Sequence, residues 1–292
     1  MTKILLIGSN GQVGTELHRV LSSYPELVAL SRPQIDLYQP EKLGELIAEI
    51  KPQIVINAAA YTAVDRAESE PDLAKLGNAI APQYIAQACA KLDAYLIHLS
   101  TDYVFDGTSS QPYSETVVTN PLSTYGRTKL AGEMAIQAYC PQHLILRTAW
   151  VYGCYGKTNF VKTMLRLGKE REVVKVVYDQ IGSPTWAGDL AAAIHHLIPQ
   201  LTPEMSGIYH YTNSGVCSWY DLAIAIFAEA KLLKFPLQIP EVIPITTLEY
   251  PTPAHRPSYS VLSSTKIRPY LDSHPPYWRD SLIKMLEELA KF

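Results

Sequence analysis

The sequence lacks several features that mark particular classes of protein. Its net charge is only −3, and its 25 basic residues form no run, which argues against binding nucleic acid. Its first apolar run, ILLI, ends at Gly8, and no other stretch approaches the roughly 18 apolar residues of a membrane span. Its few cysteines form no CxxC pair: they are Cys89, Cys140, Cys154 and Cys217. A disulfide framework or zinc site is therefore not expected, and a reducing cytoplasm fits best.

The 292 residues, 47% of them hydrophobic, are ample for a folded core. In the first half, short β-branched runs alternate with helical patterns, which is typical of βαβ units and a parallel sheet. We expect strands over 3–7, 27–30, 54–58, 94–99 and 143–148, and helices over 11–23, 40–50, 71–91 and 122–139. The second half predicts helices over 159–167, 187–198, 218–230 and 280–289, a strand over 173–177, and irregular chain over the proline-rich residues 236–257.

These patterns predict an α/β fold, a Rossmann-like doubly wound parallel sheet with a smaller C-terminal lobe. Residues 1–152 are expected to form the dinucleotide-binding domain, and segments near 173–185 are expected to rejoin it. Residues 153–292 are expected to form mainly the substrate-binding lobe. Ligands of such sheets bind in the crevice beyond the carboxyl ends of the strands.

A glycine loop directly follows the first expected strand and opens the first helix. Gly8, Gly11 and Gly14 occur in the spacing GxxGxxG. Glycines allow the tight turn and the close approach of backbone to a pyrophosphate at the helix N-terminus. The strand–turn–helix context favours dinucleotide binding over an ordinary βα turn.

The end of the second strand carries the residues that would meet the adenosine ribose. An acidic residue there binds a 2′-hydroxyl, whereas arginine accommodates a 2′-phosphate. This chain has Ser31 and Arg32, and its first carboxylate is Asp36. The pattern favours NADPH over NADH, with a solvated Arg32 as the alternative.

Tyr125 and Lys129 lie four residues apart, which places both on one face of a helix. A nearby cation lowers the pKa of a phenol, which makes proton exchange feasible near neutral pH. Thr101 ends the fourth expected strand, 24 residues before Tyr125. Its hydroxyl could polarise a carbonyl group while Tyr125 donates a proton. The alternative is a surface tyrosine beside a surface lysine.

With these residues the sequence resembles the extended short-chain dehydrogenase/reductase family and, within it, the dTDP-4-dehydrorhamnose reductases. The resemblance runs through nearly the whole chain and rests on GSNGQVG, NAAAYTAVDRAESEP, STDYVFDG, YGRTKLAGE, LRTAWVYG, NFVKTML, DQIGSPT and YPTPAHRP. It implies NAD(P)H-dependent reduction of the 4-keto group of dTDP-4-dehydro-L-rhamnose to dTDP-L-rhamnose, a step of polysaccharide precursor synthesis. The resemblance is also compatible with a bound magnesium ion and with a homodimer.

The resemblance assigns roles to particular positions. The catalytic residues become Thr101, Tyr125 and Lys129. Cofactor contacts fall on Gly8, Gly11, Gln12, Val13, Gly14, Ser31, Arg32, Asp36, Leu37, Ala60, Tyr61, Thr62 and Leu99, besides Tyr125 and Lys129. Substrate contacts fall on Thr101, Asp102, Tyr103, Trp150 and Arg256. Ser31 and Tyr61 depart from the acidic residue and the histidine that are frequent in the family, and the first departure leaves both nicotinamide cofactors open.

Several of these residues have a simpler interpretation. Trp150 could be a core residue, Arg256 could form a loop salt bridge, and His98 is expected to pack in the core. Asp65, Glu68 and Glu70 have the pattern of a solvated helix start, and no cluster of residues predicts a metal site.

Two other functions share the same sequence features. A nucleotide-sugar epimerase or dehydratase would use the same scaffold, but a dehydratase needs an Asp-Glu pair after the strand-end threonine, and Tyr103 follows Asp102 here. A non-catalytic partner, like the regulatory subunit of methionine adenosyltransferase, also resembles this family. The intact Thr101, Tyr125 and Lys129 favour the enzyme.

Overall fold

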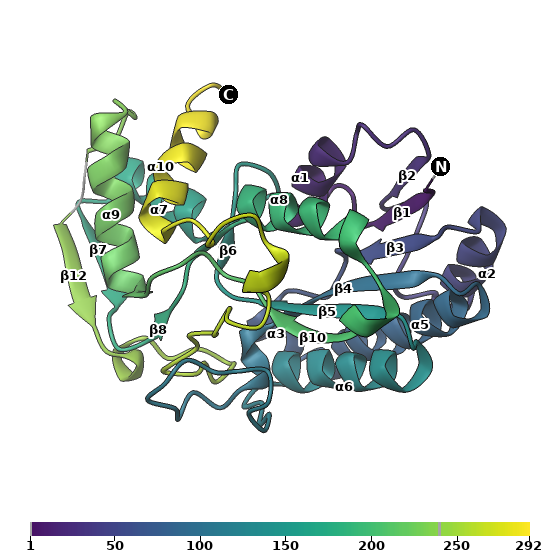
Figure 1. Cartoon of the computed structure of the whole chain (residues 1–292). Coiled ribbons are helices and arrows are strands. Elements are labelled where there is room, and N and C mark those ends of the chain that lie inside the picture. Colours follow the sequence, from purple (N-terminus) through teal and green to yellow (C-terminus); the bar gives the residue numbers. More distant parts are fainter. Residues whose placement is uncertain (1, 239–240) are drawn as a thin grey trace.

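A single parallel sheet forms the centre of the larger part of the molecule. The computed structural model describes residues 2–238 and 241–292 (Figure 1). Six strands pair in the order β10-β5-β4-β3-β1-β2, every neighbouring pair parallel. They are β1 (Ile4–Ile7), β2 (Leu27–Leu30), β3 (Ile54–Asn57), β4 (Tyr95–Thr101), β5 (His143–Thr148) and β10 (Gly207–His210). The strand order reverses between β1 and β3, which is where ligands of such sheets bind.

Helices cover both faces of this sheet (Figure 1). On one face lie α1 (Gln12–Val20) and α8 (Ala187–Leu197), and on the other α2 (Pro40–Ile50), α5 (Ala81–Lys91) and α6 (Thr124–Tyr139). Successive β1 side chains enter different cores: Ile4 and Leu6 face α1 and α8, whereas Leu5 and Ile7 face α2 and α5. This is why β1 is apolar at every position.

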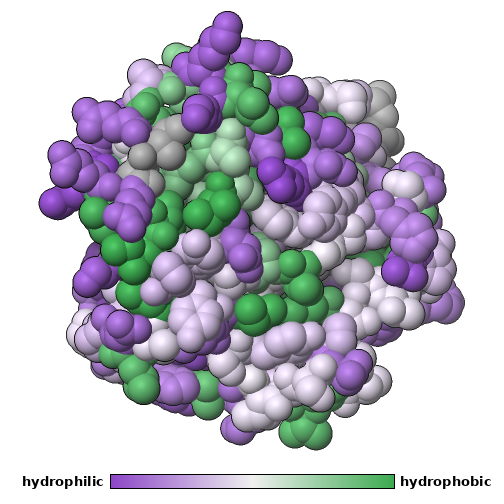
Figure 2. Space-filling view, turned by 90° about the vertical axis from the view of Figure 1, so that its left-hand side faces the viewer, coloured by the Kyte–Doolittle hydropathy of each residue, from purple (hydrophilic) through white to green (hydrophobic). Residues whose placement is uncertain are grey.

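A smaller lobe holds a second hydrophobic core. It contains α7 (Phe160–Glu170), α9 (Trp219–Leu232), α10 (Trp278–Leu289), and the parallel pair β7 (Val173–Val177) and β12 (Glu241–Ile245). Short pairs join β6 (Val151–Tyr152) to β9 (Thr185–Trp186) and β8 (Ile181–Gly182) to β11 (Cys217–Ser218). Figure 2 looks onto this lobe, where hydrophobic and hydrophilic side chains are mixed over the surface.

The predicted fold class is confirmed, and the expected strands and helices of the first 150 residues are present within a few residues of their predicted bounds. One expectation is wrong: residues 173–177 do not rejoin the main sheet, because β7 pairs with β12. The segments that return to the larger part are α8 and β10. The strand β12 lies inside the proline-rich stretch that was expected to be irregular, of which residues 239–240 lie outside the described part of the chain.

The helix expected over 71–91 is continuous but changes its winding. It runs as α4 (Pro71–Lys75), a π-helical turn over Leu76–Ile80, and α5. Such turns are frequent at functional sites. In the described ranges, no helix has the length and apolarity needed to cross a bilayer.

A buried ion pair joins α6 to the sheet. Arg147 on β5 binds Glu133 with its Nε and Nη2 atoms at 2.9 and 2.6 Å, and the Ser100 hydroxyl donates to the same carboxylate. The side chains of Arg147 and Glu133 are 2% and 1% exposed. Because both charges are removed from water, each depends on the other for compensation.

We predict that Arg147→Met lowers the free energy of unfolding by about 3–5 kcal/mol, because it leaves the Glu133 carboxylate buried and unpaired. The matched control is Arg166→Met on α7, whose pair with Glu170 is more than half exposed on the arginine side and should contribute at most about 1 kcal/mol. Urea unfolding of the two variants measures both values. Equal, small losses would contradict the prediction.

Candidate active site

The carboxyl ends of the strands bring four chain segments to one edge of the sheet. The glycine loop follows β1, residues 58–62 follow β3, Thr101 ends β4, and Trp150 follows β5. At the switch point, a Cβ atom on Gly8 would lie 2.9 Å from the backbone nitrogen of Ala59. The loops after β1 and β3 are therefore in close contact at the point where the strand order reverses.

The glycine loop leaves the N-terminus of α1 open. A Cβ atom on Gly14 would lie 1.9 Å from the carbonyl oxygen of Gly8, so only glycine permits this turn. Gly11 is the N-cap residue, and no side chain caps the first turn of α1. Backbone N–H groups of Gln12, Val13 and Gly14 at such a terminus suit a pyrophosphate, which fits a dinucleotide cofactor.

The side chain of Gln12 connects this loop to the smaller lobe. Its Nε2 atom donates to the carbonyl oxygen of Val151 at 2.9 Å, and its Oε1 atom accepts from Nδ2 of Asn159 at 2.7 Å. Asn159 also caps α7, since its Oδ1 atom accepts from the N–H of Lys162. The glycine loop and α7 are therefore held by one set of hydrogen bonds.

The end of β2 presents an exposed cation. The Arg32 side chain is 63% exposed, with Nε 3.7 Å from the Asp36 carboxylate and the guanidinium 5.0 Å from the centre of the Tyr38 ring. Asp36 accepts from the N–H of Tyr38 at 3.1 Å, and Leu37 is buried. Arg32 is thus open to solvent, with a carboxylate beside it.

Residues after β3 are held by the π-helical turn. Asn78, fully buried, accepts from the N–H of Tyr61 at 2.8 Å and donates to its carbonyl oxygen at 3.0 Å. The hydroxyl of Tyr61 donates to Glu70 at 2.6 Å. The backbone of the segment Ala60, Tyr61 and Thr62 is therefore held by an asparagine that the sequence patterns did not single out.

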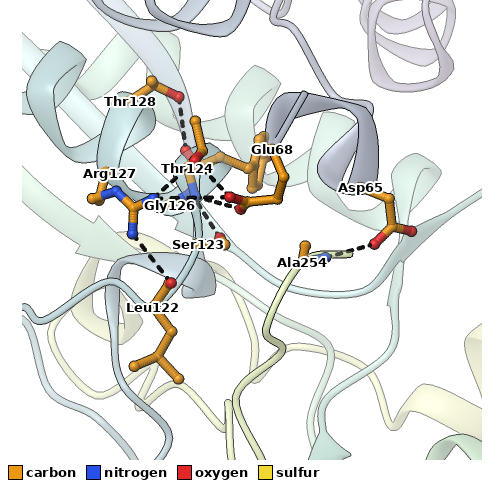
Figure 3. Close-up of polar contacts among 10 residues, drawn as sticks. Asp65, Glu68, Leu122, Ser123, Thr124, Gly126, Arg127, Thr128 and Ala254 are labelled. Atoms are coloured by element: carbon orange, nitrogen blue, oxygen red, sulfur yellow. Dashed lines mark hydrogen bonds and ion pairs between the residues drawn. The ribbon is translucent and has the colours of Figure 1, made fainter. Parts of the chain in front are cut away.

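The N-terminus of α6 is anchored before the helix reaches Tyr125. Ser123 caps it through the N–H of Gly126 at 3.1 Å, and Glu68 accepts from the N–H and hydroxyl of Thr124 at 2.7 and 2.8 Å (Figure 3). A Cβ atom on Gly126 would lie 2.2 Å from the carbonyl oxygen of Tyr103. The glycine after Tyr125 therefore allows α6 to touch the segment that follows Thr101.

Tyr125 lies among the groups that the sequence predicted beside it. Its ring packs edge-on to that of Tyr103, with centroids 5.4 Å apart. Burial raises the pKa of Tyr125 to about 12, the Thr101 hydroxyl lowers it, and the Asp102 carboxylate raises it. This direction is opposite to the expected one, because burial outweighs any effect of Lys129. A raised pKa keeps the phenol protonated, as a proton donor must be.

Lys129 is buried one turn further along α6. Its Nζ atom donates to the carbonyl oxygen of Leu99 at 2.6 Å and lies 3.2 Å from Nε2 of His98. Burial lowers the pKa of Lys129 to about 8, which the Glu133 carboxylate partly offsets. The lysine therefore exchanges its proton within reach of neutral pH.

Two of the predicted substrate residues, Asp102 and Trp150, follow the ends of β4 and β5. Asp102 is buried, accepts from the Thr101 hydroxyl at 3.0 Å, and has a pKa raised by burial to about 6. Trp150 has a positive φ of 50° and stacks on Trp219 with centroids 3.5 Å apart. Trp150 therefore joins the carboxyl edge of the sheet to the smaller lobe.

Arg256 forms a salt bridge, as the simpler interpretation of its sequence position predicted. Its Nη1 and Nη2 atoms bind the Asp65 carboxylate at 3.0 and 2.8 Å. The N–H of Ala254 donates to the same carboxylate at 3.2 Å, and this second contact is drawn in Figure 3. Asp65, Glu68 and Glu70 were expected to be a solvated helix start, and this is wrong, because each accepts hydrogen bonds from another segment. In the described residues, no three His, Cys, Asp or Glu side chains are grouped to hold a metal ion.

A glycine loop after the first strand of a parallel sheet, with a Tyr-x-x-x-Lys helix beside a strand-end threonine, defines a nicotinamide-dependent oxidoreductase of the extended short-chain dehydrogenase/reductase class. Residues 1–291 match the family described as RmlD substrate binding domain. The chain belongs to the dTDP-4-dehydrorhamnose reductase family.

Individual relatives are similar over their whole lengths. A dTDP-4-dehydrorhamnose reductase of Escherichia coli is 46% identical over 98% of this chain and 97% of its own. A crystal structure of a dTDP-4-dehydrorhamnose reductase from Clostridium acetobutylicum has a TM-score of 0.91 at 39% identity, with 99% of both chains covered. One from Bacillus anthracis in complex with NADP also has a TM-score of 0.91, at 38% identity over 99% of this chain and all of that one.

We predict that Glu68→Ala lowers the free energy of unfolding by about 1–2 kcal/mol, since it removes the carboxylate at the N-terminus of α6. Because the helix start also positions Tyr125, turnover should fall together with stability. The control is Glu49→Ala on the exposed side of α2, which should change neither. Thermal unfolding and kcat at a temperature well below the transition measure the two effects; an unchanged kcat in Glu68→Ala would show that Tyr125 does not depend on this contact.

Proposed function

We propose that this protein is a dTDP-4-dehydrorhamnose reductase, which reduces the 4-keto group of dTDP-4-dehydro-L-rhamnose to give dTDP-L-rhamnose. The observation that supports the proposal is that Thr101, at the carboxyl end of β4, lies beside Tyr125, which is one helical turn before Lys129 on α6. Full-length similarity to reductases of that name supports the choice of substrate.

Each of the three residues has a distinct part in this reduction. A bound reduced nicotinamide supplies the hydride for C4 of the sugar. Tyr125 donates its phenolic proton to the C4 oxygen, for which its raised pKa keeps it in the required form. The Thr101 hydroxyl polarises the carbonyl group, and Lys129 stabilises the phenolate that remains.

The substrate contacts are proposed on the opposite side of Tyr125. Trp150, whose ring is stacked on Trp219, follows the end of β5, and Asp102 and Tyr103 lie next to Thr101. Arg256 is held by Asp65 with 23% of its side chain exposed, and its guanidinium would add charge-assisted hydrogen bonds to the diphosphate.

The cofactor is proposed to be NADPH, with NADH accepted more weakly. Ser31, at the end of β2, has no charge that would repel a 2′-phosphate, and Arg32 is exposed beside it. The Bacillus anthracis relative in complex with NADP supports this choice. Magnesium and a homodimer stay predictions that rest on the family resemblance. A cytoplasmic location stays a prediction that rests on the four buried free cysteines.

We predict that Tyr125→Phe lowers kcat by about 10²–10⁴-fold, because general acid catalysis has that range of effect. The ring and its packing on Tyr103 remain, so the Kd for NADPH should stay within about twofold of the native value. The assay follows absorbance of the reduced nicotinamide with the dTDP-4-keto-sugar, and fluorescence titration gives the Kd. A kcat within a few-fold of the native enzyme would disprove the role of Tyr125.

We predict that the native enzyme prefers NADPH over NADH by about tenfold or somewhat more in kcat/KM, since one hydrogen bond to a charged group contributes ~1.5–3 kcal/mol. Ser31→Asp combined with Arg32→Ala should reverse the preference by adding repulsion and removing attraction. Arg171→Ala, which changes the same charge in the smaller lobe, is the control. Equal kcat/KM values for both cofactors in the native enzyme would mean that Arg32 stays with Asp36.

A further inference from the structure

A line of buried polar side chains runs from β3 through β4 to Lys129. Nδ2 of Asn57 lies 3.1 Å from Nδ1 of His98, and Nε2 of the same ring lies 3.2 Å from Nζ of Lys129. All three residues are 1% exposed. None of the roles given above uses Asn57 or His98, although buried polar groups of this kind are retained only when their hydrogen bonds are satisfied.

A hydrogen bond from the backbone of Ala59 fixes the orientation of the Asn57 amide. Its Oδ1 atom accepts from the backbone N–H of Ala59 at 3.1 Å, so its NH₂ group is the side that faces His98. An amide NH₂ group only donates. Nδ1 of His98 must therefore accept, and the neutral ring carries its proton on Nε2.

That proton is directed at Lys129. A neutral amine can accept from Nε2–H with its lone pair, whereas an ammonium group has no lone pair and presents only donors. The imidazole could accept from an ammonium group at Nε2 only if its proton moved to Nδ1. That tautomer is disfavoured, because Nδ1 accepts from the NH₂ group of Asn57. Burial and the charge of Lys129 hold the pKa of His98 well below its usual range, so the imidazolium form is not available either.

The other charged groups near Lys129 are already engaged. Glu133, which favours the ammonium form, is shared with Arg147 and Ser100. Towards the cleft lie Tyr125, protonated over the working range, and Asp102. The remaining direct partner of Nζ is the carbonyl oxygen of Leu99, which accepts from either form of the lysine.

We propose that Asn57 and His98 are positioning residues for the reduction: they hold an N–H donor against Lys129 and make it a group that gives up and regains a proton in each cycle, instead of a permanent cation. This rests on the proposed function. Burial by itself lowers the pKa of Lys129 to about 8, and an N–H donor held against Nζ acts in the same direction.

Each proton in this cycle has a donor and an acceptor. After Tyr125 has given its proton to the C4 oxygen, the Lys129 ammonium gives one proton to the phenolate, directly or through an intervening hydroxyl. The tyrosine is then neutral again, and the lysine is a neutral amine that accepts from Nε2–H of His98. Uptake of one proton from water restores the ammonium group. Turnover therefore needs protonated Lys129 and falls as pH rises through its pKa.

Asn57→Asp is the sharpest variant, because it exchanges NH₂ for an oxygen at the same position. The carboxylate still accepts from Ala59 and now also accepts from His98, so the ring proton moves to Nδ1 and Nε2 becomes an acceptor for the ammonium group. We expect the Lys129 pKa to rise by about one unit or more. The alkaline limb of kcat should move to higher pH by the same amount.

The titration is read from the ¹³Cε resonance of Lys129 in the protein without substrate, and long-range ¹H–¹⁵N spectra identify the protonated ring nitrogen of His98. His98→Phe is the second variant, since it keeps the Asn57–Ala59 contact and removes both ring nitrogens, the Nε2–H donor beside Lys129 and the Nδ1 acceptor of the Asn57 NH₂ group. It should also raise the Lys129 pKa. Asn120→Asp, which makes the same change of charge in a surface loop, should leave it unaltered.

A ring proton on Nδ1 in the native protein, or an unchanged Lys129 titration in a folded His98→Phe variant, would overturn the proposal. A purely structural role for His98 would lower stability and leave the lysine titration in place. Because these readouts need neither substrate nor turnover, they can fail while the reductase activity is intact, and loss of the proposed activity would leave them measurable.

Discussion

The structure depends on one constraint: helix α6 buries polar side chains in its interface with the sheet and the π-helical turn. Thr128, Lys129 and Glu133 all lie on its buried side, between the sheet and the π-helical turn. Each is matched by a group on another element: Thr128 by Asn78, Lys129 by the Leu99 carbonyl oxygen and His98, and Glu133 by Arg147 and Ser100. Since unmatched polar groups are costly to bury, the helix has one register in which it can pack.

That register places the reacting groups. With α6 fixed by its buried contacts and by Glu68 at its N-terminus, Tyr125 has no freedom to leave the neighbourhood of Thr101. The same burial sets the protonation states, because the pKa of Tyr125 rises and that of Lys129 falls. Desolvation thus favours a protonated phenol on Tyr125 and a lysine that can lose its proton, which are the states that the proposed reduction would use.

The two parts of the molecule are joined around this helix by long-range polar contacts. Gln12 in the glycine loop binds Val151 and Asn159, while Arg256 in the late proline-rich segment binds Asp65. These contacts are separated by more than a hundred residues in the chain, and they place the smaller lobe over the carboxyl edge of the sheet.

Local sequence determined the sheet and the helices around it, because hydrophobic period, glycine spacing and the Tyr-x-x-x-Lys pattern depend only on near neighbours in the chain. It therefore placed Gly8 after β1, Thr101 at the end of β4, and Tyr125 and Lys129 on one helix, as the structure has them; their shared role in a site stays a prediction. It did not indicate β10 or β12, which are short and obtain their pairing from strands far away. Nor did it determine the partners of Asp65, Glu68 and His98, or the rise in the pKa of Tyr125. Those depend on which distant groups share a buried space and how much water is left there, and only the tertiary structure sets both.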